Sequence, residues 1–151
     1  MMSAAHTSTI LLIEDNRDFA WLLSLTFEMM GYRIAVARNG CEGLQRAAEL
    51  KPDLIFCDIG LPGLNGYEVA AQIRANPELH ETFLIALTGY NGKNDVELAF
   101  RSGFNRHLSK PVDIASLKLL LDDLENPKQH AWREAMLCRA AAPEPLTTRK
   151  A

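Results

Sequence analysis

Hydrophobic residues follow two alternating patterns along this chain. Short apolar runs alternate with longer stretches in which apolar residues recur every three or four positions. The runs span residues 10–13, 34–37, 54–57, 83–87 and 104–108, and the helical stretches cover about 19–30, 40–50, 65–75, 93–102 and 114–124. Alternating strand and helix patterns of this kind predict an α/β protein with a parallel sheet.

The apolar runs also differ in their polar content. The runs at 10–13, 54–57 and 83–87 are continuously apolar, as is typical of central parallel strands that helices cover on both faces. The run at 104–108 includes three polar residues, and the run at 34–37 is short, rich in alanine and bounded by Arg33 and Arg38. We therefore expect these two runs to form the edges of the sheet.

Composition narrows the class of protein. The chain has 151 residues, of which 48% are hydrophobic and 23% charged, as in a soluble globular domain. Its formal net charge of −3 gives no electrostatic footprint for nucleic acid or an anionic membrane. The apolar runs are too short to cross a bilayer, and the N-terminus shows no signal peptide, so we expect a cytoplasmic protein.

The cysteines show no pattern of cross-linking or metal binding. The three cysteines, Cys41, Cys57 and Cys138, are odd in number and widely spaced. Cys57 lies inside an apolar run and is interpreted as a small core residue. The pattern therefore indicates neither a disulfide framework nor a zinc site.

The domain boundaries follow from where the periodicity starts and stops. We expect an N-terminal tail at 1–7, one domain at 8–125 and a C-terminal tail at 126–151. Asn126-Pro127 ends the last periodic helix. The tail carries a helical stripe that includes Trp132, so residues 128–140 either form a short helix that docks on the domain or a partner, or pack loosely.

Polar side chains follow four of the apolar runs. Glu14 and Asp15 follow the first run and Asp58 the third, so a right-handed doubly wound sheet brings their carboxylates together. Clustered like charges need a cation, and Mg²⁺ fits these oxygen ligands. Each acid could instead cap a helix, and Thr88, after the fourth run, could cap one or donate to a phosphoryl oxygen. Lys110, after the fifth run, favours one composite site.

These motifs resemble the receiver domain of two-component response regulators, of the chemotaxis-regulator type, over about residues 8–125. The matching segments are Ile-Leu-Leu-Ile-Glu14-Asp15-Asn16, Phe-Cys-Asp58-Ile-Gly-Leu-Pro62-Gly-Leu-Asn-Gly66-Tyr-Glu, Ala-Leu-Thr88-Gly-Tyr90 and His107-Leu-Ser-Lys110-Pro111. The resemblance implies a flavodoxin-like, five-stranded parallel sheet of order 2-1-3-4-5 with five helices.

The resemblance also implies a phosphoryl-transfer site. Asp58 would be the phosphoacceptor, attacking the phosphoryl group on a histidine of a sensor kinase or phosphotransfer protein. Asp15, Asp58 and the backbone carbonyl of Gly60 would ligate Mg²⁺, with Glu14 acting through a bound water.

Further roles follow from the same resemblance. Lys110 would pair with the carboxylate or phosphoryl oxygen, and the Thr88 hydroxyl would move to the phosphoryl group. Gly60 and Tyr90 would flank that group, Tyr90 screening it from water and Gly60 leaving its side open. His107 stands where the family usually has an aromatic switch residue. It either switches with a dependence on pH, because burial disfavours its charged form, or faces solvent without such a role.

The loop after Asp58 is expected to turn tightly. Pro62 and Gly66 fit such a turn, with Gly66 adopting dihedral angles that other residues avoid, although an ordinary strand-to-helix turn would look the same. The spacing of Gly60, Gly63 and Gly66 matches no nucleotide-binding fingerprint.

Several functional hypotheses remain. The first is a stand-alone receiver, because residues 126–151 are too few for an effector domain and the chain starts at Met1. Such a receiver would signal by protein contacts through the fourth helix, fifth strand and fifth helix. It could also pair as a homodimer through the same surface. The others are a receiver of a hybrid kinase and a non-phosphorylated interaction module. A haloacid-dehalogenase-type phosphatase needs a second aspartate two residues after its nucleophile, where this chain has Gly60. We expect a phosphoacceptor and no enzyme acting on external substrates.

Overall fold

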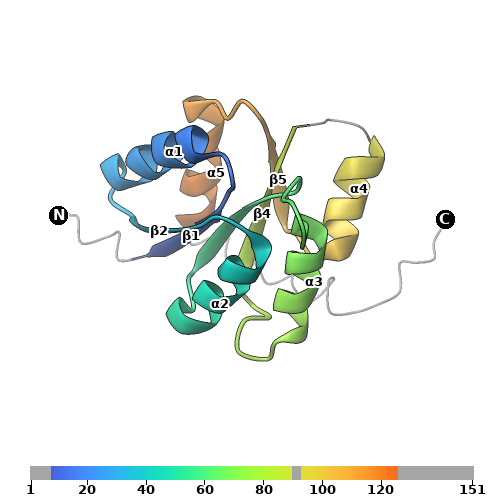
Figure 1. Ribbon diagram of the computed structural model, residues 1–151. Helices are drawn as coiled ribbons and strands as arrows, with labels where there is room; N and C mark the ends of the chain where they lie inside the picture. The colour runs from blue at the N-terminus through green and yellow to red at the C-terminus, as the bar shows by residue number, and fades with distance from the viewer. Residues whose placement is uncertain (1–7, 90–92, 126–151) are drawn as a thin grey trace. The chain divides into compact units, whose positions relative to one another are not determined.

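The computed structural model describes residues 8–89 and 93–125, and it comprises two units. Residues 1–109 contain the sheet and the first four helices, and residues 110–151 contain the fifth helix (Figure 1). The strands are β1 (Thr9–Ile13), β2 (Arg33–Ala37), β3 (Leu54–Asp58), β4 (Phe83–Thr88) and β5 (Arg106–Ser109). The helices are α1 (Arg17–Met29), α2 (Gly40–Leu50), α3 (Gly66–Ala75), α4 (Lys93–Ser102) and α5 (Ile114–Glu125).

The five strands form one parallel sheet in the order β2-β1-β3-β4-β5, so the predicted fold class is confirmed. All residues of β3 and β4 are buried, as are those of β1 apart from Thr9. The more polar β2 and β5 lie at the two edges, as their composition predicted. Continuous burial explains the continuously apolar runs, because helices cover both faces of the central strands.

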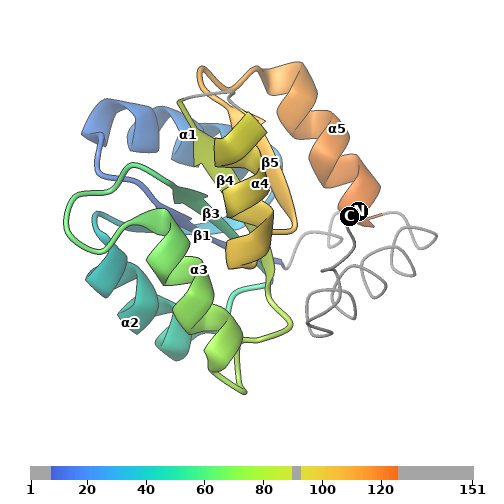
Figure 2. The ribbon, with the colours of Figure 1, turned by 90° about the vertical axis from the view of Figure 1, so that its right-hand side faces the viewer.

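Alternating side chains of the strands build a core on each face of the sheet. On one face, α2, α3 and α4 cover the sheet, and Ala47, Val69 and Ala99 belong to the core there; α3 and α4 lie side by side (Figure 2). On the opposite face, Phe27 of α1 stacks on Phe56 of β3 with ring centroids 4.9 Å apart. This layering leaves the carboxyl ends of the central strands between the two helical layers of the first unit.

The fifth strand begins two residues later than the apolar run predicted. Phe104 is buried in the core, and the Asn105 backbone N–H donates to the Leu84 carbonyl at 2.8 Å just before the strand begins. Asn105 Oδ1 accepts hydrogen bonds from the Leu84 backbone N–H (2.8 Å) and from an Arg74 guanidinium nitrogen (2.8 Å). Hydrophobicity alone therefore predicted the buried position and missed where the strand starts.

Asparagine residues start three of the helices. The side chains of Asn16, Asn39 and Asn65 accept backbone N–H groups in the first turns of α1, α2 and α3. Asn65 forms a full capping box, because Glu68 in turn accepts the Asn65 backbone N–H at 2.9 Å. These caps satisfy N–H groups that have no partner within the helix, and so fix where each helix starts beyond its strand.

The second unit contains α5, whose predicted apolar stripe is largely buried. Asp113 caps this helix, accepting hydrogen bonds from the Ala115 backbone N–H (3.1 Å) and the Ser116 hydroxyl (2.8 Å). The buried members of the stripe are Leu117, Leu120, Leu121 and Leu124. The helix expected over 128–140 lies outside the described residues. Within the described ranges, no helix has the length and apolar character needed to cross a membrane.

Candidate functional site

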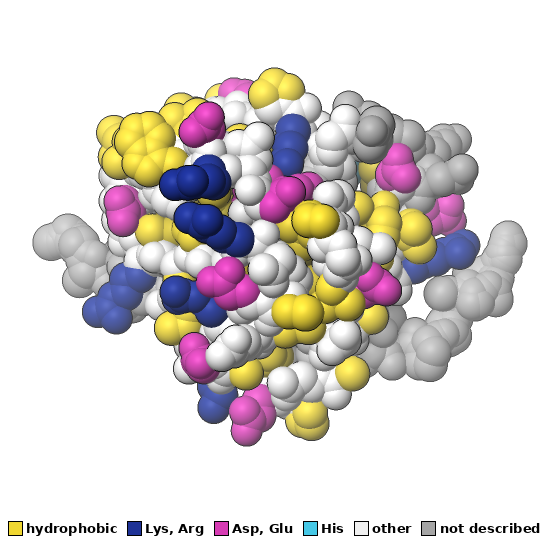
Figure 3. Space-filling model, in the orientation of Figure 1, with side chains coloured by type: hydrophobic (Ala, Val, Ile, Leu, Met, Phe, Trp, Pro, Cys, Tyr) yellow, Lys and Arg dark blue, Asp and Glu magenta, His cyan; other side chains and the backbone are white. Residues whose placement is uncertain are grey.

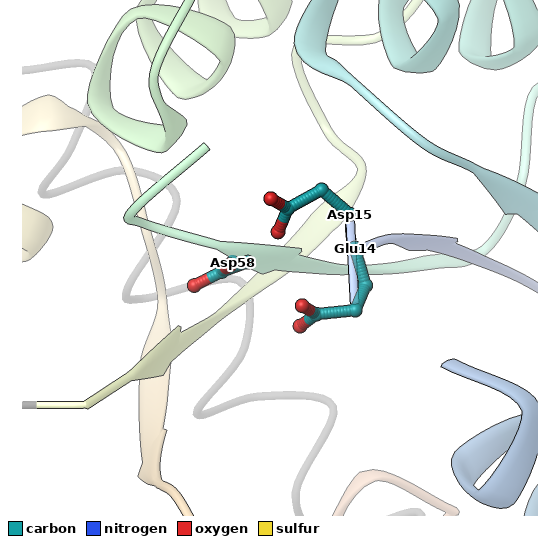
Figure 4. Close-up of side chains that lie close together, drawn as sticks. All are labelled: Glu14, Asp15 and Asp58. Carbon is teal, nitrogen blue, oxygen red and sulfur yellow. The ribbon is translucent and has the colours of Figure 1, made fainter. Parts of the chain in front are cut away.

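The predicted acidic residues come together at the carboxyl ends of β1 and β3. Glu14 and Asp15 directly follow β1, and Asp58 is the last residue of β3, the neighbouring strand. Carboxylate oxygens of the three residues lie within 4.8 Å of one another. In Figure 4 their carboxylates face a common space. The structure therefore brings together the three acids that the sequence placed in one cluster.

The three acids differ in their surroundings. Glu14 is 1% exposed and Asp58 7% exposed, whereas Asp15 is open to solvent. Glu14 Oε2 accepts the Asn16 backbone N–H at 3.1 Å, and Asp58 Oδ1 accepts the Gly60 backbone N–H at 3.2 Å. Backbone donors thus orient two buried carboxylates while the third reaches toward water. Charged groups so close together are stable when a cation shares them.

Thr88 ends β4 beside this cluster in the sheet register. Asp58 pairs with Leu87 across β3 and β4, so Thr88 follows the register partner of Asp58 directly. Thr88 is 3% exposed, and no residue in the described part of the chain gives its Oγ1 a hydrogen-bond partner. A buried hydroxyl without a partner is costly and is commonly retained for a ligand.

The loop after β3 turns tightly, although Gly66 contributes differently from the prediction. A Cβ at Gly66 would lie 2.6 Å from the Asp58 carbonyl oxygen and 2.7 Å from Ile59 Cα. Gly66 is therefore required by close backbone approach, and it is not among the described glycines with positive φ. The positive dihedral angle in this loop belongs to Gly63, with φ of 72°. The prediction was right about the tight turn and wrong about which residue adopts the unusual angles.

Gly60 leaves one side of Asp58 open. A Cβ at Gly60 would meet Asp58 Oδ1 at 3.9 Å and no other atom within 4 Å among the described residues. The side chain of any other residue would extend from that point beside the carboxylate. Gly60 therefore places no side-chain atom beside the Asp58 carboxylate, and its effect on a phosphoryl group stays a prediction.

The remaining predicted side chains are those of Lys110, Tyr90 and His107. Lys110 follows β5 directly and is the first residue of the second unit, so its pairing with Asp58 stays a prediction. Tyr90 lies outside the described residues. His107 is half-buried on β5, and its ring meets Phe100 of α4 edge to face with centroids 6.1 Å apart. The described contacts thus link His107 to α4.

Cys57 directly precedes Asp58 in the chain, but its thiol is unreactive. Its side chain is fully buried. Burial raises the pKa of the Cys57 thiol far above its usual range, and the nearby carboxylates of Asp58 and Glu14 raise it further. The thiol therefore stays protonated near neutral pH, as expected for the core residue that the sequence predicted.

Sequence reasoning overlooked the capping box at the start of α3. Asn65, three residues before Glu68, is a recognisable helix-start signal. The box fixes the first turn of α3, where Gly66 packs against the backbone of Asp58. These residues do not touch the cluster chemically, but they hold the loop that follows the phosphoacceptor candidate.

The donor set of the cluster fits a divalent cation. Three carboxylates offer hard oxygen atoms at separations that one ion can bridge, and the exposed side at Asp15 leaves room for water. Mg²⁺ binds in this manner, through one or two carboxylates with several waters retained. The buried Thr88 hydroxyl adds a donor that an incoming anionic group could use.

Fold and site together define a doubly wound α/β protein with an acidic cluster around a strand-end aspartate. The model of one family, the response regulator receiver domain, matches residues 10–122. The chain therefore belongs to this family of two-component signalling proteins. Receiver domains bind Mg²⁺ at an acidic site and interact with histidine kinases or phosphotransfer proteins.

Individual relatives agree with this assignment. The polar-differentiation response regulator DivK of Brucella anthropi is 35% identical over 106 residues, which cover 70% of this chain and 86% of DivK. The transcriptional regulatory protein AfsQ1 of Streptomyces coelicolor is 38% identical over 104 residues, covering 69% of this chain and 45% of AfsQ1. This chain thus corresponds to less than half the length of AfsQ1.

A solved receiver domain shows the same architecture with a metal. The receiver domain of the sensor histidine kinase PA1611 from Pseudomonas aeruginosa is 31% identical, with a TM-score of 0.71, and the match covers 76% of this chain and 94% of that domain. That structure has a magnesium ion coordinated in its active-site cleft.

Proposed function

We propose that this chain is a cytoplasmic response regulator that accepts a phosphoryl group on Asp58 from a sensor histidine kinase or a phosphotransfer protein. The observation that carries the proposal is the position of Asp58. Its carboxylate ends a buried strand, receives the Gly60 backbone N–H and lies within 4.8 Å of the Glu14 and Asp15 carboxylates. Without the neighbouring carboxylates, a single acid at this position would be explained equally well as a helix cap.

The cluster is assigned to Mg²⁺ binding. Asp15, Asp58 and the Gly60 carbonyl would be the direct ligands, and Glu14 would act through a bound water. When bound, Mg²⁺ supplies positive charge that neutralises the carboxylates and the phosphoryl oxygens. The donor atoms of the cluster support this assignment, as does the magnesium ion in the related PA1611 domain.

The transfer itself is a nucleophilic substitution at phosphorus. An Asp58 carboxylate oxygen attacks the phosphorus atom, the bond from phosphorus to the histidine nitrogen breaks, and the neutral imidazole leaves once protonated. The Thr88 hydroxyl donates to a phosphoryl oxygen, which gives its buried Oγ1 a partner. Lys110 neutralises a second oxygen. Positioning and charge neutralisation supply most of the rate, as is usual in phosphoryl transfer.

Neighbouring residues tune the lifetime and the output. Gly60 leaves the phosphoryl group open to water, and Tyr90 screens it. Thr88 and His107 are assigned as switch residues, and the edge-to-face contact of His107 with Phe100 would transmit a change of the histidine to α4. Phosphorylation then biases a pre-existing two-state equilibrium that a target protein, or a second copy of the chain, reads through α4, β5 and α5.

The chain is assigned as a stand-alone receiver, with the domain at residues 8–125 and flanking tails at 1–7 and 126–151. The match to DivK, which covers 86% of that response regulator, supports this assignment. The second candidate is the receiver of a hybrid kinase, which the likeness to the PA1611 domain favours. An antibody against this chain tests the choice, because a hybrid kinase would give a far heavier band in cell extracts than 151 residues allow.

Intact mass spectrometry tests the phosphoacceptor. The chain is incubated with acetyl phosphate and Mg²⁺, alongside Asp58→Asn and the matched control Asp122→Asn, an exposed acid on α5. Gain of one phosphoryl group by the parent and the Asp122 variant alone supports the proposal. Equal gain by the Asp58 variant assigns the group to another residue, and no gain from acetyl phosphate or from phosphorylated kinases would favour a non-phosphorylated interaction module.

A further inference from the structure

Helix α1 carries exposed apolar side chains along its outer side. Trp21, Leu25 and Met29 recur every four residues, so they lie along one face, and Leu22 stands beside them. Their exposed fractions run from 40% for Leu25 to 81% for Met29. Figure 3 shows an apolar patch over this helix. We call these four side chains the α1 stripe, and the function proposed above uses none of them.

The α1 stripe lies opposite the side of the helix that packs on the sheet. The buried residues of α1 are Ala20, Leu23 and Phe27. Leu25 stands two residues from both Leu23 and Phe27, which is about 200° around a helix of 3.6 residues per turn. A surface helix usually carries polar residues on its outer side, whereas a helix that is apolar all round is buried. The outer side of α1 is therefore suited to packing against a second apolar surface.

The charged residues of α1 are confined to its two ends. None lies between Asp18 and Glu28. Arg17 and Glu28 are about three helical turns apart, so they stand on the same edge of the α1 stripe, one at each end. Both side chains are exposed, and neither forms an ion pair with another described residue. This edge thus presents a positive charge at one end and a negative charge at the other.

This pattern is complementary to itself under a two-fold axis that crosses the middle of α1. When two copies of α1 pack antiparallel, Arg17 of each copy lies opposite Glu28 of the other, because the two residues are nearly equidistant from the middle of the helix. The same symmetry puts Trp21 against Leu25 of the second copy. Asp18 stays at the rim, where its carboxylate keeps contact with water. A parallel pairing would instead bring like charges together.

We infer that α1 is a homodimer interface, on which a second copy of this chain packs antiparallel along the α1 stripe. A helix of 13 residues is about 20 Å long and about 10 Å wide, so the contact is smaller than the roughly 800 Å² per partner of a standard interface. The dimer is therefore weak and forms at micromolar or higher concentrations. It requires neither Mg²⁺ nor phosphorylation, which separates it from pairing through α4, β5 and α5.

Sedimentation velocity of the full chain over the micromolar range, without Mg²⁺ or a phosphodonor, measures the association. The two tryptophans are Trp21 and Trp132, so Trp132→Phe leaves Trp21 as the fluorophore. Its emission should shift to shorter wavelength over the same concentrations, as the indole is buried. Leu25→Glu should weaken association at least tenfold, because it places a charge in the apolar contact. Leu98→Glu, at an exposed leucine of α4, is the matched control and should leave association unchanged.

Charge reversal tests the antiparallel geometry. Arg17→Glu and Glu28→Arg each bring like charges together at both ends of the interface, and each should weaken association by roughly tenfold. A chain carrying both changes should associate like the parent, and a mixture of the two single variants should associate more tightly than either alone. Circular dichroism verifies the fold of every variant.

Four results would overturn the inference. They are a parent chain that stays monomeric with unchanged Trp21 emission, a Leu25→Glu variant that associates like the parent, a double charge variant no better than the single ones, and a Leu98→Glu variant that weakens association as much as Leu25→Glu. If the parent is monomeric and Leu25→Glu slows phosphoryl transfer from a phosphorylated donor protein, the α1 stripe is a surface for that donor instead.

Discussion

The Thr88 hydroxyl should matter for phosphorylation and not for the stability of the fold. Its buried Oγ1 has no partner among the described residues, so the folded chain pays for desolvating a hydroxyl. Thr88→Val keeps the shape and removes that group. We expect the free energy of unfolding, measured by urea denaturation, to stay the same or rise by about 1 kcal/mol, while phosphorylation slows about tenfold or more. Thr88→Ser keeps the hydroxyl and serves as the control, and a loss of stability in the valine variant would contradict the hydroxyl's lack of a partner.

The two described cysteines should react very differently. Cys41 is exposed, whereas Cys57 is buried and burial holds the pKa of its thiol far above the ordinary value. The thiolate is the reactive form, so iodoacetamide at pH 8 should label Cys41 and leave Cys57 unmodified until urea is added. Peptide mapping by mass spectrometry measures both sites in one sample. Labelling of Cys57 at the rate of Cys41 in the native chain would contradict its burial.

A capping box stabilises the start of helix α3. Asn65→Ala removes the acceptor for the Glu68 backbone N–H and should cost about 1 kcal/mol of unfolding free energy in urea denaturation. Glu68→Ala breaks the other half of the box, while Glu68→Gln keeps an oxygen that can accept the Asn65 N–H. If the glutamine and alanine variants lose equal stability, the box is not the cause.

The start of α5 carries a pH-dependent cap. The hydroxyl of Ser116 and the backbone N–H of Ala115 donate to Asp113, which lowers the pKa of that carboxyl below its ordinary value of 3.8. A lowered folded-state pKa means that the cap stabilises α5 fully above the unfolded value and is lost as the pH falls through the folded value. An NMR titration should show the pKa of Asp113 returning toward 3.8 in Ser116→Ala. An unchanged value would assign the shift to the backbone N–H groups alone.

Elements were predictable from sequence where burial follows local pattern. The parallel sheet, its edge strands and the span of α2 follow from apolar runs and helical periodicity, whereas the strand order was implied by the resemblance to receiver domains. The start of β5 does not, because it depends on hydrogen bonds that the Asn105 side chain accepts from Leu84 and Arg74, which are distant in sequence. The role of Gly66 is hidden for the same reason, since the backbone that it touches comes from the preceding strand.

At the scale of the whole molecule, the parallel sheet explains why the acids were predictable and the α1 stripe was not. Every strand ends at the same edge, so Asp15 and Asp58 had to converge once their strands were neighbours. The α1 stripe instead depends on how α1 packs on the sheet. Apolar residues lie on two sides of this helix, and their spacing is compatible with burial of either side until the fold is known.

Repulsion among the clustered carboxylates should lower the stability of the metal-free chain. Two unit charges within 4.8 Å of each other repel by roughly 3.5 kcal/mol or more at an effective dielectric constant of about 20. The metal-free chain is therefore destabilised by its own site, and Asp15→Asn should raise the melting temperature in EDTA by relieving part of this repulsion. The exposure of Asp15 makes the gain smaller than the full Coulomb energy, because solvent screens it.

Adding Mg²⁺ should make the parent chain melt at a higher temperature than Asp15→Asn, the reverse of the order expected in EDTA. A ligand at ten times its Kd stabilises the folded state by about 1.4 kcal/mol, which raises the melting temperature by roughly 5 °C for a domain of this size. The parent should gain that stability and Asp15→Asn should gain less, because it lacks a ligand. Differential scanning fluorimetry against NaCl of equal ionic strength measures both, with Asp18→Asn as the matched control, an exposed acid of the first turn of α1 outside the cluster. An equal rise in melting temperature for the parent and Asp15→Asn would mean that the cluster does not bind the ion through Asp15. Such a rise would be nonspecific screening, which acts on any exposed carboxylate alike.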